Sequence, residues 1–262
     1  MTETVLLVDR EGRAARHFAS LKPKILRSAD DVQNAFDEYS RQALWIVLKA
    51  SGMSRLAALR GRHGERRLLC LDRVEGVRRE ILHAHFRFVV ALTDGVELLP
   101  IDQIAEVLAD PNREDLFIGG AVDTVDRAVV LYRGNLEPLV VPLAWFSRSG
   151  GPSPDSGKFE VSDFGQTVRF GEFEAAADTI LYEFDSEARR RFKKKTVAED
   201  DSFGGALRRL RKQRGIRRED FDGISAKEIA RLERGEVSQP QADTLKKLAK
   251  TLGVRPDEIV TY

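Results

Sequence analysis

Short apolar runs and one helical periodicity alternate in the first third of the chain. Residues 5–8 and 68–71 are apolar runs bounded by polar residues, and such runs are typical of buried strands. Ser28 precedes apolar residues that recur every three to four positions. This spacing predicts a helix that begins after Ser28 and runs beyond Val47.

Turn signals then predict β-hairpins and further strands. An Asp-Gly or Gly-Asn pair between two apolar runs favours the tight turn of a hairpin. The chain has two such arrangements: residues 86–92 and 96–99 around Asp94-Gly95, and residues 128–132 and 136–141 around Gly134-Asn135. We expect a short helix at 101–108, between the hairpins, and further strands at 159–161 and 167–170.

The last sixty or so residues have a different pattern, in which short helical segments end at glycines. The expected helix stops are Gly215, Gly235 and Gly253. Residues 216–222 would form a very short second helix, followed by a tight turn that contains Gly223. Two short helices joined by such a turn, with further helices packed behind them, form a helix-turn-helix scaffold.

The helix after this turn has an N-terminal capping signal. The Ser225 hydroxyl can accept a hydrogen bond from the Glu228 amide, while the Glu228 carboxylate reaches back to the Ser225 amide. Ile229 and Leu232 then fall on the inward face. The sequence therefore predicts a helix whose first turn is fixed and whose opposite face is exposed.

Composition and charge limit the class of protein. The 262 residues are 42% hydrophobic and 32% charged, which allows packed cores, and no apolar run is long enough to span a membrane. The N-terminus lacks the pattern of a signal peptide and Cys70 is the single cysteine, so we expect a reducing cytoplasm. Residues 118–185 hold 5 basic and 11 acidic residues, whereas residues 202–262 hold 14 and 9. The basic end favours a polyanionic partner, although charged helices are also simply soluble.

Residues that could carry catalysis or bind a metal are few. The histidines are His17, His63, His83 and His85. The last two would share one face of a strand, which falls short of a metal site and favours a structural role. Glycine-rich phosphate loops and the G-x-S-x-G nucleophile elbow are absent. We therefore expect no enzyme, no cofactor and no metal, with an unfamiliar active site in residues 1–117 as the alternative.

The middle of the chain resembles a small β-rich bacterial module of unassigned biochemistry. The resemblance covers residues 118–187 and rests on the hexapeptide 141–146 (VPLAWF) and on Gly165-x-x-Val-Arg-Phe170. It implies no known activity.

The C-terminal segment closely resembles the Cro and λ-repressor-like (XRE-type) helix-turn-helix domains. The matching stretches are residues 207–215, 223–235 and 244–253. About three residues fewer than usual separate Gly215 from Ile229, so the second helix is about one turn short. Phe221 would replace the usual aliphatic core residue there.

This resemblance implies that the helix from Ser225 to Arg234 enters the major groove of double-stranded DNA. The implied DNA-binding residues are Arg217, Arg218, Ser225, Ala226, Lys227, Arg231 and Arg234. Arg231 would bond guanine O6 and N7, and Lys227 would contact guanine or phosphate. Ala226 would offer a methyl contact. Arg217, Arg218 and Arg234 would contact phosphates, which fix register but carry no sequence information.

Other charged residues near this helix have two interpretations. Glu233 is either a structural partner for an arginine of the first helix, which we favour, or a base reader. The lysines 246, 247 and 250 form a solvated face or a contact with DNA, and the first is favoured. The basic run 189–195 is a linker between domains or an arm that contacts phosphate.

We therefore predict an α+β multidomain protein. The expected parts are a mixed α/β domain (1–117), a β-rich acidic module (118–187), a charged linker (188–201) and an all-α five-helix helix-turn-helix domain (202–262). The expected function is that of a dimeric, sequence-specific transcriptional regulator in the cytoplasm, associated with the nucleoid and bound to a DNA operator. The alternative is an antitoxin-like interaction subunit, in which residues 1–187 bind a partner protein while the C-terminal domain autoregulates the operon.

Overall fold

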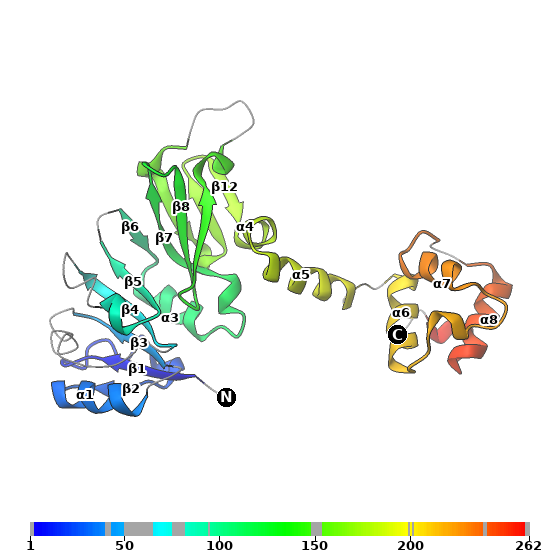
Figure 1. Cartoon of the computed structure of the whole chain (residues 1–262), viewed down its shortest axis with the longest axis horizontal. Coiled ribbons are helices and arrows are strands. Elements are labelled where there is room, and N and C mark those ends of the chain that lie inside the picture. The colour runs from blue at the N-terminus through cyan, green and yellow to red at the C-terminus, as the bar shows by residue number, and fades with distance from the viewer. Residues whose placement is uncertain are drawn as a thin grey trace. The chain divides into compact units, whose positions relative to one another are not determined.

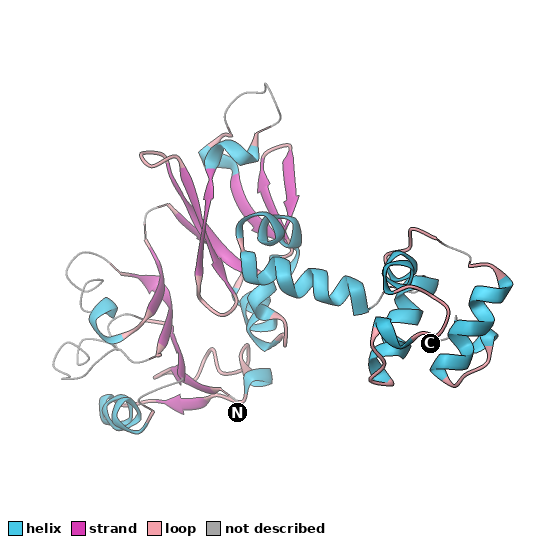
Figure 2. Ribbon diagram, turned by 45° about the vertical axis from the view of Figure 1, so that its right-hand side comes forward, coloured by secondary structure: helices cyan, strands magenta, loops and turns pink. Residues whose placement is uncertain are grey.

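The structure is a computed structural model that describes residues 3–39, 43–49, 65–74, 82–93, 95–147, 154–198, 200, 202–237 and 240–259. The chain divides into two compact units, Met1–Ser186 and Glu187–Tyr262. The described part of the first unit holds three β-sheets with helices, and that of the second unit is helical (Figures 1 and 2). No described helix is long and apolar enough to cross a membrane.

A five-stranded parallel sheet begins the first unit. The strand order is β2-β1-β3-β4-β5 (Figure 1). The strands are β1 (Thr4–Val8), β2 (Lys24–Leu26), β3 (Ala43–Val47), β4 (Arg67–Arg73) and β5 (Phe88–Leu92). All five residues of β3 are buried. A strand inside a parallel sheet is covered on both faces, which explains why β3 is apolar along its whole length. The strands expected at 5–8 and 68–71 are confirmed.

Helix α1 (Ala29–Glu38) begins where the sequence predicts but ends earlier. The Asp31 amide donates to Ser28 Oγ at 3.0 Å, and the Ser28 amide donates to Asp31 Oδ2 at 2.8 Å, which completes a capping box. The prediction that this helix runs beyond Val47 is wrong, because the last part of the pattern is strand β3. A short apolar run fits the face of a buried helix and a buried strand equally well.

Two antiparallel sheets complete the first unit, with strand orders β6-β7-β8-β9 and β10-β11-β12. The strands are β6 (Val96–Leu98), β7 (Phe117–Asp123), β8 (Ala128–Arg133), β9 (Pro138–Pro142), β10 (Phe159–Ser162), β11 (Thr167–Phe170) and β12 (Phe173–Ala176). The first unit also contains the helices α3 (Ile101–Ala109) and α4 (Ala177–Phe184) and the 3-10 helices η1 (Ala19–Leu21), η3 (Arg113–Asp115), η4 (Leu143–Phe146), η5 (Ser156–Lys158) and η6 (Asp163–Gly165). The helix expected at 101–108 and the strands at 159–161 and 167–170 are confirmed.

One of the two expected hairpins is present. Strands β8 and β9 pair antiparallel around Gly134-Asn135, with Leu131 opposite Leu139. The prediction of a hairpin around Asp94-Gly95 is wrong, because β5 pairs with β4 in the parallel sheet whereas β6 pairs with β7. The chain does turn there, with the Val96 amide 3.1 Å from the Thr93 carbonyl oxygen, but it passes from one sheet to another.

The pairing of β6 with β7 crosses the division that we expected at residue 117. Glu97 lies opposite Gly120, and Leu98 lies opposite Gly119. The two strands approach closely at Gly119, which has φ +156°, and a Cβ there would lie 2.2 Å from the Glu97 carbonyl oxygen. The β-rich sheet therefore includes a strand that precedes residue 117.

The second unit begins within helix α5 (Ser186–Ala198) and contains the helices α6 (Phe203–Gln213), α7 (Ala226–Glu233) and α8 (Ala242–Leu252), with 3-10 helices η7 (Arg218–Asp220) and η8 (Pro256–Ile259). Most of the expected charged linker is therefore the helix α5. One apolar core joins α6, α7 and α8 through Leu207, Leu210, Phe221, Ile229, Leu232, Leu248 and Leu252. Helices α6 and α7 touch at Gly204, where a Cβ would lie 2.3 Å from the Leu232 carbonyl oxygen.

Candidate nucleic-acid interface

Helix α7 is short, capped and buried along one face. The Glu228 amide donates to Ser225 Oγ at 3.2 Å, which confirms half of the expected capping box. Among the described residues, no hydrogen bond joins the Ser225 amide to the Glu228 carboxylate. Ile229 is fully buried and Leu232 is 2% exposed, so the core fixes which face of α7 points outward.

The segment before α7 is less helical than the sequence predicts. Only Arg218–Asp220 is helical, as a 3-10 turn, where the sequence predicts a very short helix over 216–222. Phe221 follows this turn, is 3% exposed and belongs to the apolar core of the second unit. Gly223 has φ +70°, a conformation that glycine adopts without strain.

The exposed residues of α7 are mainly basic, with Glu228 as the acidic exception. Lys227, Arg231 and Arg234 are exposed, and Ala226 is half-buried at the first turn. Lys227 makes no hydrogen bond or ion pair with any residue that the structure describes. The core under α7 and the cap at its N-terminus thus present three basic side chains from one short helix to solvent.

A buried carboxylate joins three of the helical segments. Glu233, at the end of α7, is 4% exposed. Its carboxylate accepts hydrogen bonds from Nε and Nη2 of Arg211 in α6, the second at 3.2 Å. Nε and Nη2 of Arg218 donate to its Oε2 at 3.0 and 2.7 Å. The interpretation of Glu233 as a structural partner for an arginine of the first helix is confirmed.

The electrostatics of Glu233 follow from these contacts. Burial raises the pKa of a carboxyl group, but the hydrogen bonds from Arg211 and Arg218 outweigh that effect and hold the pKa of Glu233 below its ordinary value. Glu233 is therefore ionised and fixes η7 against α6 and α7. The resemblance to known domains predicts a phosphate contact for Arg218, and the sequence pattern gives no sign of its contact with Glu233.

A second carboxylate, Glu236, lies between two of the candidate arginines. Arg231 Nε lies 3.0 Å from Glu236 Oε2, and Arg234 Nε lies 2.7 Å from Glu236 Oε1. The hydrogen bonds from Arg234 and Arg231 lower the pKa of Glu236. All three side chains are about half exposed, at 50%, 58% and 43% for Arg231, Arg234 and Glu236. The chain turns back toward α7 at Gly235, so the glycine that ends the helix is the sequence signal that could have predicted Glu236 as a partner of these arginines.

The remaining basic candidates, Arg217 and the lysines of α8, are exposed. The Arg217 guanidinium lies on the Asp220 carboxylate, with Nη2 3.1 Å from Oδ1, and the pair is exposed. Lys246, Lys247 and Lys250 are exposed on α8, and Lys247 pairs with Asp243 at 3.3 Å. This placement supports their interpretation as a solvated face.

Nothing among the described residues suggests a metal centre. No group of three or more His, Cys, Asp or Glu side chains is arranged to bind an ion in that part of the chain. His83 and His85 lie in a helical turn rather than on a strand, so the expectation that they share a strand face is wrong. His85 is 6% exposed, and burial lowers its pKa, with a smaller contribution from Arg66.

Comparison with known proteins identifies the same segment of the chain. Residues 207–259 match a family model whose description is Helix-turn-helix. This range begins in α6 and ends with η8, so it covers the buried core and the outward face of α7. No curated protein and no solved structure matches the chain.

Proposed function

Starting from the helix-turn-helix domain formed by residues 207–259, we propose that the chain is a dimeric, sequence-specific transcriptional regulator that binds double-stranded DNA. Helix-turn-helix domains bind DNA with the second helix of the motif in the major groove. The observation that carries the proposal is the outward face of α7, which presents Lys227, Arg231 and Arg234 from a helix fixed by a buried core.

The side chains at the start and middle of α7 read the bases. Arg231 bonds guanine O6 and N7 through two guanidinium N–H groups. Lys227 lies one turn earlier on the same face and has no partner among the described residues, so it is available for guanine or phosphate. Ala226 and Ser225 lie at the N-terminal end of α7, where side chains approach the base edges most closely.

The arginines around this helix hold the DNA backbone. Arg234 lies at the end of α7, and Arg217 and Arg218 flank the start of η7. Arg218 keeps Nη1 free of any partner among the described residues, because its bonds to Glu233 use Nε and Nη2. It can therefore contact a phosphate without leaving Glu233.

Carboxylates compete with DNA for three of these arginines. Glu236 holds Arg231 and Arg234, and Asp220 holds Arg217. All of these pairs are exposed, and exposed pairs contribute little net free energy. A phosphate or a guanine can therefore replace the carboxylate, and the carboxylates keep the arginines ordered when DNA is absent.

One such domain reads only a few base pairs, so two copies are needed for an operator. A symmetric dimer places its two recognition helices about one helical turn of DNA apart, which is about 34–36 Å or 10–10.5 base pairs. The chain would then act on the bacterial chromosome in the cytoplasm.

Selection of genomic fragments with the full-length protein tests this proposal. We expect enrichment of an inverted repeat with half-sites about one helical turn apart, bound by two chains. No enrichment over random fragments would contradict sequence-specific recognition. A co-purifying protein that is required for DNA binding would instead support the antitoxin-like alternative.

A further inference from the structure

The order of strands in the parallel sheet marks one place where a ligand can bind. In the order β2-β1-β3-β4-β5, the chain passes from β1 to one side and then crosses to β3 on the other. The next strand in the chain therefore lies on one side for β1 and on the other side for β3, and such an arrangement opens a crevice at the carboxyl ends of the two strands. Ligands of doubly wound α/β proteins bind at such switch points.

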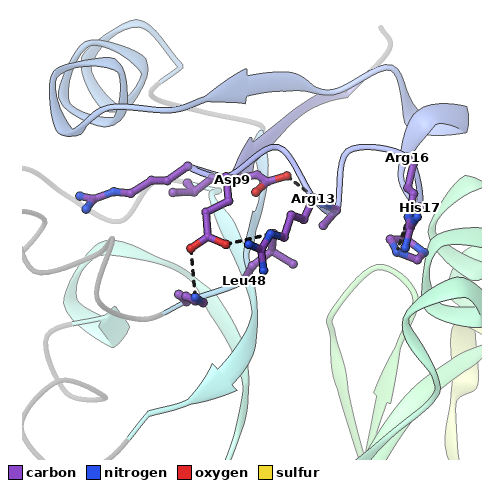
Figure 3. Close-up of a pocket in the computed structure, with 10 residues that line it drawn as sticks. Asp9, Arg13, Arg16, His17 and Leu48 are labelled. Atoms are coloured by element: carbon purple, nitrogen blue, oxygen red, sulfur yellow. Dashed lines mark hydrogen bonds and ion pairs between the residues drawn. The ribbon is translucent and has the colours of Figure 1, made fainter.

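A pocket of about 510 Å³ lies at this edge of the sheet. Residues 8–17, which end β1 and follow it, form most of its wall, and Leu48 and Lys49 come from the end of β3. Figure 3 shows Asp9, Arg13 and Leu48 gathered around one end, with Arg16 and His17 at the other. The volume lies within the range of about 300–1,000 Å³ of small-molecule sites.

Asp9 fixes the loop that forms the pocket. It is the residue directly after β1 and is 3% exposed. Its Oδ2 accepts hydrogen bonds from the amides of Ala14 at 2.9 Å and Ala15 at 3.2 Å. A buried carboxylate that holds two amides of one loop keeps that loop in place without a ligand. The side chains of Arg10, Glu11 and Arg13 thus reach the pocket from a preformed turn.

The charge around the pocket is positive. The wall contains the basic residues Arg10, Arg13, Arg16 and Lys49 and the acidic residues Asp9 and Glu11. Glu11 holds Arg13, with Oε2 3.2 Å from Nε, and Lys49, with Oε1 3.3 Å from Nζ. Arg10 forms no ion pair with a described residue. The excess of positive charge, with an arginine not engaged by a carboxylate, suits an anion.

We propose that this switch-point pocket binds a small organic polyanion through phosphate or carboxylate groups. Arg10, Arg13 and Lys49 contact the anionic groups, and Asp9 acts as a positioning residue that holds the loop. Glu11 occupies part of the anion site when the pocket is empty and gives up Arg13 and Lys49 when the anion enters. The proposal concerns the first unit and does not depend on DNA binding.

Calorimetric titration of the full-length chain with pyrophosphate and, separately, with citrate tests this site. We expect one equivalent of at least one probe to bind, and the preferred probe identifies the anionic group. Arg10→Gln should weaken that binding about tenfold or more, because one charge-assisted contact is lost. Glu11→Gln should strengthen it several-fold, because the competing carboxylate is removed.

The matched control is Arg127→Gln, which removes one exposed arginine from the same unit at a distance in sequence from the pocket. It should bind the probe as the unmodified chain does. Binding that survives Arg10→Gln would place the anion elsewhere, for example on the basic second unit, and would overturn the proposal. Absence of binding for both probes would also overturn it. Arg10 is exposed and forms no ion pair with any residue that the structure describes, so its loss should leave the fold unchanged.

Discussion

Arg218 donates two hydrogen bonds to the buried carboxylate of Glu233, at 3.0 and 2.7 Å. The same carboxylate holds Arg211, so a single charged side chain connects α6, η7 and α7. The 3-10 turn η7 is thereby held by an ionic contact in addition to the apolar contact of Phe221. This arrangement makes the orientation of α7 depend on Glu233.

Replacement of Glu233 by Gln should destabilise the second unit by about 3 kcal/mol, because two arginines lose their charged partner in a buried site. Both tryptophans, Trp45 and Trp145, lie in the first unit. In urea unfolding, the transition of the second unit, monitored by far-ultraviolet circular dichroism, should therefore shift to lower urea concentration. The transition monitored by tryptophan fluorescence should not shift. Glu236→Gln, an exposed control, should leave both transitions unchanged. Equal transitions for Glu233→Gln and the unmodified chain would show that the ion pairs contribute nothing.

The same residue should make the second unit sensitive to acid. The folded-state pKa of Glu233 lies below its ordinary value of 4.5, so its contribution to stability is fully present above that pH. It is lost as the pH falls below 4.5 and through the folded-state pKa, because the unfolded chain then binds the proton more readily. The difference in stability between the unmodified chain and Glu233→Gln should shrink across that range. A difference that stays constant from neutral pH to acid would contradict the depressed pKa.

Removal of Glu236 should tighten DNA binding, although it deletes no contact with DNA. Glu236→Gln frees Arg231 and Arg234 from an exposed carboxylate and removes one negative charge close to the phosphates. We expect an increase in affinity of about two- to fivefold, as exposed pairs are weak. Fluorescence anisotropy with labelled duplexes would measure it, and the control is Glu258→Gln, which removes a half-exposed carboxylate on η8 that pairs with Arg255. Weaker binding by Glu236→Gln would show that the carboxylate positions the arginines productively.

Arg231 and Arg234 share one carboxylate but should differ in what they recognise. Arg231→Ala should weaken the free energy of binding to the selected site by about 1–3 kcal/mol and should change binding to random DNA little, because contacts with the bases distinguish one sequence from another. Arg234→Ala should weaken binding to both duplexes alike and reduce the salt slope by about one unit per site. Titrations of both duplexes at several salt concentrations separate these outcomes. Equal losses for Arg231→Ala on the two duplexes would place its guanidinium on phosphate.

Local signals predicted local structure well. The Ser28 and Ser225 caps bond amides three residues away, and both contacts are present. Failures arose where the outcome depends on distant segments. The Asp-Gly pair at 94–95 is typical of a hairpin, yet β5 pairs with β4 and β6 with β7, because better partners for each strand lie elsewhere in the chain.

The site shows the same distinction. The resemblance to a known motif identified α7 and its exposed basic residues, since their spacing on a helix is fixed. It did not identify the partners of those residues. Arg218 reaches Glu233 only because the turn at η7 brings it across α7, and Glu236 reaches Arg231 only because the chain reverses at Gly235. Such contacts depend on how segments cross, which periodicity along the sequence does not encode.

The pairing of β6 with β7 has a consequence for how this chain can be recombined with others. A gene fusion that took the β-rich module from residue 117 onward would leave β6 behind, and the edge of β7 would lose its bonds to residues 96–98. An open edge of that kind is a template for aggregation. A gene segment that encodes the whole sheet must therefore begin before Val96. That position lies within the region that the sequence pattern assigns to the preceding domain.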